Sequence, residues 1–365
     1  MKTKVLVYPK DPNPYQELLY SQLRSRCEIK YLENPTDSPI IGLIMLYLQS
    51  LYYRIKGYTI FHLHWYYTFY PPFNNRLLNN LLTKTFYSTI FISYIVFIKI
   101  LKYKLVWTVH NVIPLQKQFS DDIRVVKILS KLADTKIVHS KNTINKMHVL
   151  GLNTNNSHII PHGNYIDVYK NEINRNDSRK YFMFKEDDYI FLFFGIIQQY
   201  KGVEDLLSSF VKLSKKEKNV KLLIAGRCYD NNIKQKLNWY RNEYKDSIKI
   251  CNNYIDDDIV QYYYNCADVV VYPVKEITTS GSVMLAQTFG KPIICPKKGN
   301  LKGLPKDIAF LYDIDYKDGL FKTMEYAIKN KYMLKVMGIN AYKYAKQFSW
   351  DKIANQTYYV YKNID

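Results

Sequence analysis

The segment richest in chemistry is the run YPVKEITTSGSVMLAQTFGKP, which begins at Tyr272. It starts on a buried strand pattern, and its polar loop ends, just before an apolar helix pattern, in four residues: Thr279, Ser280, Gly281 and Ser282. Free N–H groups and hydroxyls at the start of a helix bind anions. One serine there would serve as a helix cap, whereas four such residues in a row favour an anion site.

A second loop offers a cation. The strand pattern FLFFG ends at Gly195, and the loop after it runs to Lys201 and Gly202. A glycine lets the backbone approach a ligand, and Lys201 can reach a phosphate from the start of the next helix, so the loop fits a diphosphate. It has no P-loop order, and no G-x-G-x-x-G follows a strand, so nicotinamide and flavin binding have no support. A plain strand-to-helix turn explains the loop equally well.

Arg227 follows Gly226 at the end of the strand pattern LLIAG. This position places a cation at the carboxyl edge of a strand, where an anionic ligand would bind. The commoner explanation for such a residue is an exposed surface arginine.

These loops need a framework that brings strand ends together. Strand and helix patterns alternate from Lys4 to Pro161 and again from Tyr189 to Cys295. Such alternation predicts an α/β fold of two doubly wound Rossmann-like lobes, each built on a parallel sheet with helices on both faces. Ligands of such sheets bind at the carboxyl ends of the strands. The polar stretch Lys170 to Lys180 is the expected join.

The net charge of +20 predicts an anionic partner. No acidic residue occurs between Asp37 and Asp121, an interval rich in apolar residues that contains Arg54, Lys56, Arg76, Lys84, Lys99, Lys102, Lys104 and Lys117. An apolar and basic surface suits the headgroup region of an anionic leaflet. Core helices with solvated basic edges explain the pattern equally well. The longest charge-free apolar run, Phe86 to Ile98, is too short to span a bilayer, so we expect a peripheral protein.

The five cysteines are scattered and show no metal-ligand spacing, so we expect reduced core thiols. The N-terminus runs into a strand pattern without the apolar segment of a secretory signal. We therefore expect a cytoplasmic protein.

Taken in order, the motifs resemble a known family. They are strand-G-x5-K-G, IAG, Y-I-D-D-D-x3-Y-Y-Y-x2-A-D-V-V-V-Y-P and S-G-S-x3-A-x3-G-K-P, with WTVHN, VHS and IPHG before them and FSWDKIA after them. This order is similar to that of bacterial GT-B glycosyltransferases related to glycosyltransferase family 4. The resemblance covers nearly the whole chain and is densest from Gly195 to Pro292.

The resemblance implies three parts: an acceptor-binding domain over residues 1–168, a donor-binding domain over 169–345, and a closing helix over 346–365 that returns to the first domain. It implies a UDP- or GDP-sugar donor and a glycan or lipid-linked acceptor in surface polysaccharide synthesis. Lys201 and the segment Ser280 to Ser282 would hold the donor diphosphate, with Gly195 close to the donor. Arg227 would be a further contact, and His110 would lie beside the donor sugar.

Two departures from the family pattern concern the donor. Ile196 stands where the family often has arginine, and the second glutamate of the E-x7-E pair falls at Leu285. Leucine cannot accept hydrogen bonds from a ribose, so the nucleotide must be held differently. The resemblance places the first glutamate at Glu276, although the loop there is longer than the pattern expects, with eight residues between Glu276 and Leu285.

On the acceptor side, the expected residues are Asn13, Tyr15, His64, Trp65 and Asn111. The aromatic run that begins at Trp65 suits either a sugar platform or a packed loop. If the anomeric configuration inverts, His110 or Asp121 is the candidate base; if it is retained, no base is evident.

No metal or cofactor is expected. His62 and His64 lack a third ligand nearby in sequence, and we expect their rings to point to opposite faces of the strand. The triplet Asp256 to Asp258 opens a helix pattern, where aspartate caps the helix.

Two other classes of function agree with some of these sequence features. A sugar-nucleotide epimerase or a phosphorylase would share the architecture. A non-catalytic protein that binds nucleic acid or membranes would suit the charge, but no recognisable nucleic-acid module is present, and we expect no nucleic-acid partner.

Overall fold

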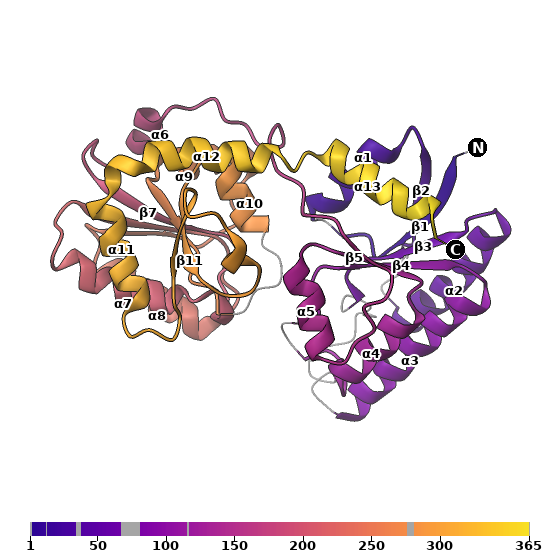
Figure 1. Ribbon diagram of the computed structural model, residues 1–365. Helices are drawn as coiled ribbons and strands as arrows, with labels where there is room; N and C mark the ends of the chain where they lie inside the picture. The colour runs from indigo at the N-terminus through magenta and orange to yellow at the C-terminus, as the bar shows by residue number, and fades with distance from the viewer. Residues whose placement is uncertain are drawn as a thin grey trace. The chain divides into compact units, whose positions relative to one another are not determined.

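The computed structural model describes residues 2–11, 13–33, 38–66, 81–114, 117–275 and 281–364. The chain forms two compact units: unit 1 is Met1–Gly163 with Trp350–Asp365, and unit 2 is Asn164–Ser349. Each is an α/β structure with one six-stranded sheet (Figure 1). The chain passes from one unit to the other after Gly163 and again after Ser349, where the sequence analysis places the boundaries after residues 168 and 345.

The sheet of unit 1 is parallel throughout, in the order β2-β1-β3-β4-β5-β6. Its strands are β1 (Thr3–Tyr8), β2 (Cys27–Tyr31), β3 (Ile60–Leu63), β4 (Lys104–Val109), β5 (Thr135–Val138) and β6 (Ser157–Ile159). The chain extends the sheet from β1 to β2 and then crosses back to β3. The switch point, where ligands of such sheets bind, therefore lies between β1 and β3.

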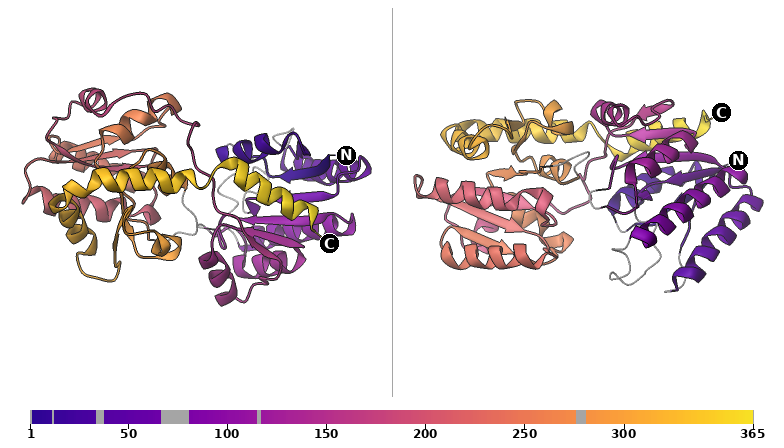
Figure 2. Two further views of the ribbon diagram at one scale, coloured as in Figure 1. Left: turned by 45° about the horizontal axis from the view of Figure 1, so that its top comes forward. Right: turned by 90° about the horizontal axis from the view of Figure 1, so that it is seen from below.

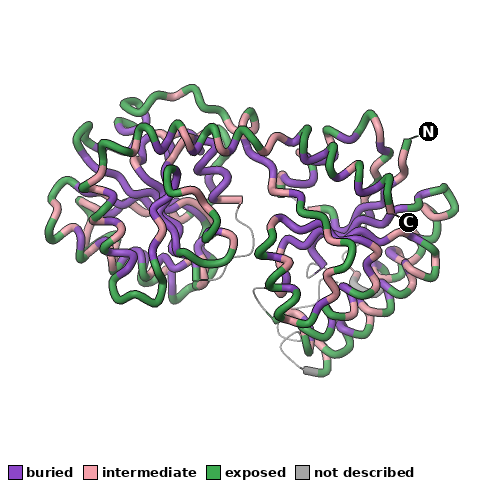
Figure 3. Tube along the Cα trace, in the orientation of Figure 1, coloured by how far each residue is buried: buried purple, intermediate pink, exposed green. Residues whose placement is uncertain are grey.

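Helices cover both faces of this sheet. They are α1 (Pro14–Leu23), α2 (Pro39–Ile55), α3 (Leu81–Ile100), α4 (Asp122–Leu132), α5 (Lys141–Val149) and α13 (Trp350–Lys362). Val5 and Val7 pack in one core with α1 and α13, and Leu6 packs in another with α3 and α4, because successive residues of a strand face opposite sides. The strands are accordingly buried (Figure 3), and α13 lies beside α1 (Figure 2). In the part of the chain that the structure describes, no helix is long and apolar enough to cross a membrane.

Unit 2 repeats the design with a parallel sheet in the order β12-β11-β10-β7-β8-β9. Its strands are β7 (Tyr189–Phe194), β8 (Val220–Ala225), β9 (Ile248–Cys251), β10 (Val269–Val271), β11 (Ile293–Pro296) and β12 (Ala309–Tyr312). The chain builds β7, β8 and β9 outward and then returns to place β10 on the other side of β7. This switch point lies between β7 and β10.

The helices of unit 2 pack in pairs: α6 on α9, α7 on α11 and α10 on α12. They are α6 (Arg175–Tyr181), α7 (Val203–Ser214), α8 (Asn231–Glu243), α9 (Val260–Cys266), α10 (Gly281–Thr288), α11 (Gly319–Lys329) and α12 (Leu334–Lys346), with short 3-10 helices η2 (Gln199–Lys201), η3 (Asp257–Ile259), η4 (Gly299–Gly303) and η5 (Lys331–Met333). The sequence patterns gave no assignment for β12, α11 and α12.

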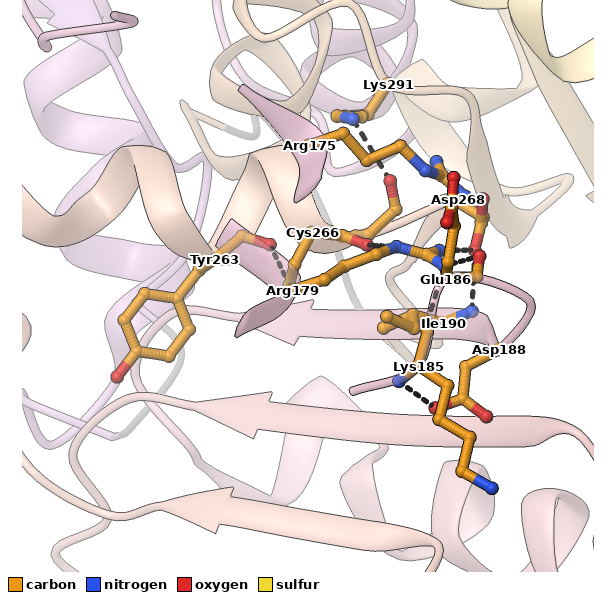
Figure 4. A network of polar contacts seen from close by, with 11 residues as sticks. Arg175, Arg179, Lys185, Glu186, Asp188, Ile190, Tyr263, Cys266, Asp268 and Lys291 are labelled. Carbon is orange, nitrogen blue, oxygen red and sulfur yellow. Dashed lines mark hydrogen bonds and ion pairs between the residues drawn. The ribbon is translucent and has the colours of Figure 1, made fainter. Parts of the chain in front are cut away.

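The predicted join at Lys170 to Lys180 is wrong, because half of this stretch is helix α6. Arg179 is buried and donates to the carboxylate of Asp268 at 2.8 Å, while Arg175 donates to the other oxygen of that carboxylate at 2.5 Å. Figure 4 shows this network, in which Asp268 also accepts from the backbone N–H of Ile190 at 2.7 Å. The stretch is polar because its charged side chains fix α6 to the amino ends of the strands.

Candidate active site

In unit 2, three segments converge at the switch point between β7 and β10. Gly195 follows β7, Gly226 follows the neighbouring strand β8, and Ser282 lies in the first turn of α10. A Cβ atom on Gly226 would lie 1.9 Å from the carbonyl oxygen of Gly195, and one on Gly195 would lie 3.4 Å from Oγ of Ser282. The two turns and the helix start are therefore close neighbours, and the phosphate site that the sequence predicts there stays a prediction.

Lys201 occupies the loop between β7 and α7. Gly202 after it has a φ of +71°, and a Cβ atom there would lie 2.0 Å from the carbonyl oxygen of Pro273. The N–H of Lys275 donates to the carbonyl oxygen of Tyr200 at 2.8 Å. These contacts fix the loop that carries Lys201 against the loop that leaves β10.

Among the residues that the structure describes, the ammonium group of Lys201 has no carboxylate partner. It is half-buried, and no Asp or Glu of the described residues lies within ion-pair distance of it. It lies 5.3 Å from the ring centroid of Tyr200. Burial lowers the pKa of Lys201 to about 8, because a charged amine is less well solvated there. A bound phosphate would supply the missing negative charge.

Gly226→Ala tests how tightly these turns pack. The residue has a φ of +140° and the new Cβ atom would overlap the carbonyl oxygen of Gly195, so we expect the free energy of unfolding to fall by at least about 2 kcal/mol. Gly303→Ala is the control, since a Cβ atom there meets nothing within 4 Å. Urea unfolding measures both variants, and equal stabilities would contradict the packing described here.

The structure describes only some of the other residues that were predicted to bind the sugar donor. Arg227 is exposed, with its guanidinium 5.1 Å from the ring centroid of Tyr229. Ser282 hydrogen-bonds to the phenol of Tyr272. Leu285 is buried in α10. Glu276, Thr279 and Ser280 lie outside the described residues, so the pairing of Lys201 with Ser280 stays a prediction.

In unit 1, five histidines gather at the carboxyl ends of β3, β4, β5 and β6. We call His62, His64, His110, His139 and His162 the histidine cluster. Neighbouring ring centroids in this order are 4.2, 5.4, 5.2 and 5.8 Å apart. Burial lowers the pKa of His62 and His139 to about 3 and the pKa of His64 and His110 well below the usual value. These four rings are therefore neutral at pH 7.

Several predicted acceptor residues meet in this cluster. Tyr15 is buried, with its ring edge-on to His110 at 4.8 Å and to His64 at 5.8 Å between centroids. Trp65 stacks on His110 at 4.2 Å with an angle of 8° between the rings. Asn13 caps α1, its Oδ1 accepting from the N–H of Tyr15 at 3.0 Å. Asn111 follows His110 and is half-buried.

The two candidate bases are engaged elsewhere. Nε2 of His110 lies 3.1 Å from Nδ1 of His64, and Nδ1 of His110 lies 3.3 Å from Nε2 of His139. Asp121 caps α4 by accepting from the N–H of Arg124 at 2.9 Å, and no contact among the described residues joins it to the histidine cluster. Both ring nitrogens of His110 are engaged in these contacts, whereas Asp121 is exposed and uses one carboxylate oxygen for the cap.

Two expectations from sequence need correction. His62 and His64 do not point to opposite faces: residues two apart on a strand share a face, and both rings bind the hydroxyl of Tyr20, at 2.8 and 2.7 Å. Asp256 precedes η3 without a side-chain capping bond, and Asp258 pairs with Lys170 at 2.8 Å. Within the described ranges, no group of three or more potential ligands is arranged to hold a metal.

Sequence reasoning missed His139, His162 and Tyr20. The first two lie in the motifs VHS and IPHG, which carried the family resemblance but received no role. Tyr20 lies on α1 and carried no signal, because an aromatic residue on the buried face of a helix is usually core.

Comparison with known proteins decides the family of the second unit. Residues 174–344 match the family of glycosyl transferases group 1. This part of the chain is a glycosyltransferase domain. An uncharacterized glycosyltransferase of Methanocaldococcus jannaschii is 26% identical over 203 residues, which are 49% of this chain and 46% of that protein. The chain spans about half the length of the curated relatives it matches.

Solved structures establish the fold of the whole chain. Sucrose-phosphate synthase from Thermosynechococcus elongatus matches 99% of this chain and 98% of its own, with a TM-score of 0.75 and 16% identity. Anabaena HepE in complex with UDP matches 99% of this chain and 100% of its own, with a TM-score of 0.75 and 15% identity. HepE with UDP-glucose gives a TM-score of 0.74 at 14% identity over 98% of this chain and 99% of its own. The predicted GT-B architecture of two Rossmann-like units is confirmed, and the assignment to family 4 stays a prediction.

Proposed function

We propose that the protein transfers a sugar from a nucleotide-diphosphate sugar, a UDP- or GDP-sugar, to a glycan or lipid-linked acceptor in surface polysaccharide or glycoconjugate synthesis. The observation that carries the proposal is Lys201, a half-buried cation at the switch point of the glycosyltransferase domain that pairs with no carboxylate of the described residues. HepE, which shares the fold, binds UDP and UDP-glucose, which supports a nucleotide-sugar donor.

In the proposed reaction, the acceptor hydroxyl oxygen bonds to the anomeric carbon while the bond from that carbon to the terminal phosphate oxygen breaks, and the hydroxyl proton passes to the released diphosphate or to water. Negative charge then grows on the leaving diphosphate. Lys201 and the start of α10 at Ser282 would stabilise that charge where it develops. Because Lys201 supplies a positive charge, we expect EDTA to leave the transfer rate unchanged, and a loss of activity that Mg²⁺ restores would contradict this expectation.

A panel of nucleotide sugars tests the donor class. We expect UDP- or GDP-sugars to raise the melting temperature, and an acceptor mixture to speed release of the nucleoside diphosphate. An epimerase would change the sugar without an acceptor. A shift with DNA but with no nucleotide sugar would favour the non-catalytic alternative.

We further propose that α2 and α3 bind an anionic cytoplasmic leaflet. The two helices pack together, with the hydroxyl of Tyr47 3.0 Å from that of Ser93. The exposed residues described on α2 are all large and apolar: Ile41, Ile44, Leu48, Leu51, Tyr52 and Ile55. Those on α3 are uncharged and include Leu82, Phe86, Val96 and Ile100. Lys56 and Lys102 at the helix ends, with no acidic residue between Asp37 and Asp121, suit anionic headgroups.

Vesicle flotation tests this surface. We expect the protein to float with vesicles that contain phosphatidylglycerol and not with neutral ones, and we expect the double variant Ile44→Asp, Leu48→Asp to stay in solution. Val149→Asp is the control, because Val149 is 84% exposed on α5, outside this surface. Equal flotation of all variants would contradict the proposal. A change in oligomeric state of the double variant without a change in flotation would assign the surface to a second copy of the chain.

A further inference from the structure

A continuous hydrogen-bonded chain runs through the histidine cluster. Nδ1 of His139 lies 2.9 Å from the carbonyl oxygen of Ile160, and Nε2 of the same ring lies 3.3 Å from Nδ1 of His110. Nε2 of His110 lies 3.1 Å from Nδ1 of His64, and Nε2 of His64 lies 2.7 Å from the hydroxyl of Tyr20. Each of the three rings therefore uses both nitrogens.

The carbonyl end gives this chain a direction. A carbonyl oxygen only accepts, so His139 must donate from Nδ1, and as a neutral ring it accepts at Nε2. The partner of that acceptor is Nδ1 of His110, which must donate, leaving Nε2 of His110 to accept from Nδ1 of His64. Nε2 of His64 then accepts from the Tyr20 hydroxyl. One tautomer of each ring satisfies every bond.

We infer that His64, His110 and His139 are held as neutral Nδ1–H tautomers, and that His139 and Tyr20 are positioning residues for His110 in glycosyl transfer. The inference about catalysis rests on the proposed function, and the inference about tautomers does not. In this tautomer, Nε2 is the one basic nitrogen of His110, and it accepts a hydrogen bond from His64. His110 is therefore not the base that receives the proton of the acceptor hydroxyl. Its neutral ring instead fixes the stacked ring of Trp65.

The surroundings favour the neutral state. The groups that perturb the pKa values of His64, His110 and His139 by their charge are other members of the histidine cluster, and each lowers the pKa. The aromatic neighbours are Tyr15, edge-on to His139, Tyr20, edge-on to His64, and Trp65, stacked on His110. A proton added to His110 would place two N–H groups face to face across the 3.1 Å contact with His64. The chain thus resists protonation as a unit.

Helix α13 supports the far end of the chain. The hydroxyl of Tyr361 lies 2.5 Å from Nδ1 of His62, and that nitrogen lies 2.8 Å from the hydroxyl of Tyr20. His62 is held from its other side by Thr108, whose Oγ1 is 2.7 Å from Nε2. Through His62, the closing helix is therefore linked to the Tyr20 hydroxyl that donates to His64.

Long-range ¹H–¹⁵N NMR of the full chain tests the tautomers directly. We expect three neutral imidazoles with the proton on Nδ1 from pH 5.5 to 8.5, assigned by loss of each signal in the single His→Gln variants. Nε2–H tautomers, or a ring that becomes cationic in this range, would overturn the inference. This measurement needs no substrate, so a failure of the proposed function leaves it unaffected.

Variants of His139 test the positioning role. His139→Gln keeps an amide near Nε2 that can accept from His110, whereas His139→Leu removes the acceptor. We expect His139→Leu to shift the tautomer of His110 and to lower kcat at least tenfold with the donor KM within twofold, and His139→Gln to restore most of kcat. Tyr20→Phe, which removes only a hydroxyl, should shift the tautomer of His64 if His139→Leu does not fold. Unchanged tautomers in Tyr20→Phe and in any folded His139→Leu would overturn the positioning role.

Discussion

Lys201→Ala is expected to lower kcat/KM for the donor by about 100-fold to 1000-fold, the range found when one group that stabilises developing charge is removed. The loss should appear in both donor binding and kcat, because the ammonium would contact the diphosphate before reaction and would interact with it more strongly as negative charge grows there while the bond to the sugar breaks. Initial rates of nucleoside diphosphate release, measured across donor concentrations, give the two constants.

We expect Lys201→Ala to fold at least as stably as the native protein. Burial lowers the pKa of Lys201, which means that the folded protein disfavours the charged amine at pH 7, so its removal is expected to keep or raise the free energy of unfolding. Lys245→Ala, an exposed lysine of the same unit, is the control and should change neither quantity. A Lys201→Ala enzyme that turns over normally would remove Lys201 from the donor site.

The sequence predicted those strands whose residue pattern directly reflects their burial in the structure. The runs that became β7 and β8 are apolar throughout because both faces of a central parallel strand are covered, so their ends at Gly195 and Gly226 could be found. Lys201 could be found because it follows such a strand in a loop that begins and ends with glycine.

What the sequence concealed depends on contacts between distant segments. Helix α6 was taken for a linker because it is rich in polar residues, one of which, Arg179, forms a buried ion pair with Asp268. Asp268 is distant in sequence, so no pattern near Arg179 predicts this partner. The histidine cluster was equally hidden. His64, His110 and His139 follow three different strands, and only the parallel order β3-β4-β5 brings these strand ends side by side.

The pH dependence of donor binding should identify Lys201 as the phosphate contact. Its pKa in the free enzyme is about 8, so below pH 8 it carries its charge and binds the diphosphate fully. Above pH 8 the amine must first take up a proton, and the dissociation constant for UDP is expected to rise up to tenfold per pH unit until the pKa of the bound state is reached. Calorimetry between pH 6.5 and 10 measures this slope.

Two substitutions test whether Lys201, and not another titrating group, causes this pH dependence. Arginine keeps its charge above pH 12, so the dissociation constant of Lys201→Arg should be flat from pH 7 to 10, even if its value is higher because the geometry changes. Lys291 has a pKa that burial also lowers to about 8, but its ammonium donates to the carbonyl oxygen of Ala267 at the opposite, amino edge of the sheet. Lys291→Met should therefore keep the slope of the native protein. The outcome against Lys201 is that Lys291→Met abolishes the pH dependence of the dissociation constant while Lys201→Arg retains it. The diphosphate would then not bind at Lys201, because the protonation of a group affects ligand binding only when the group lies close enough to interact with the ligand's charge.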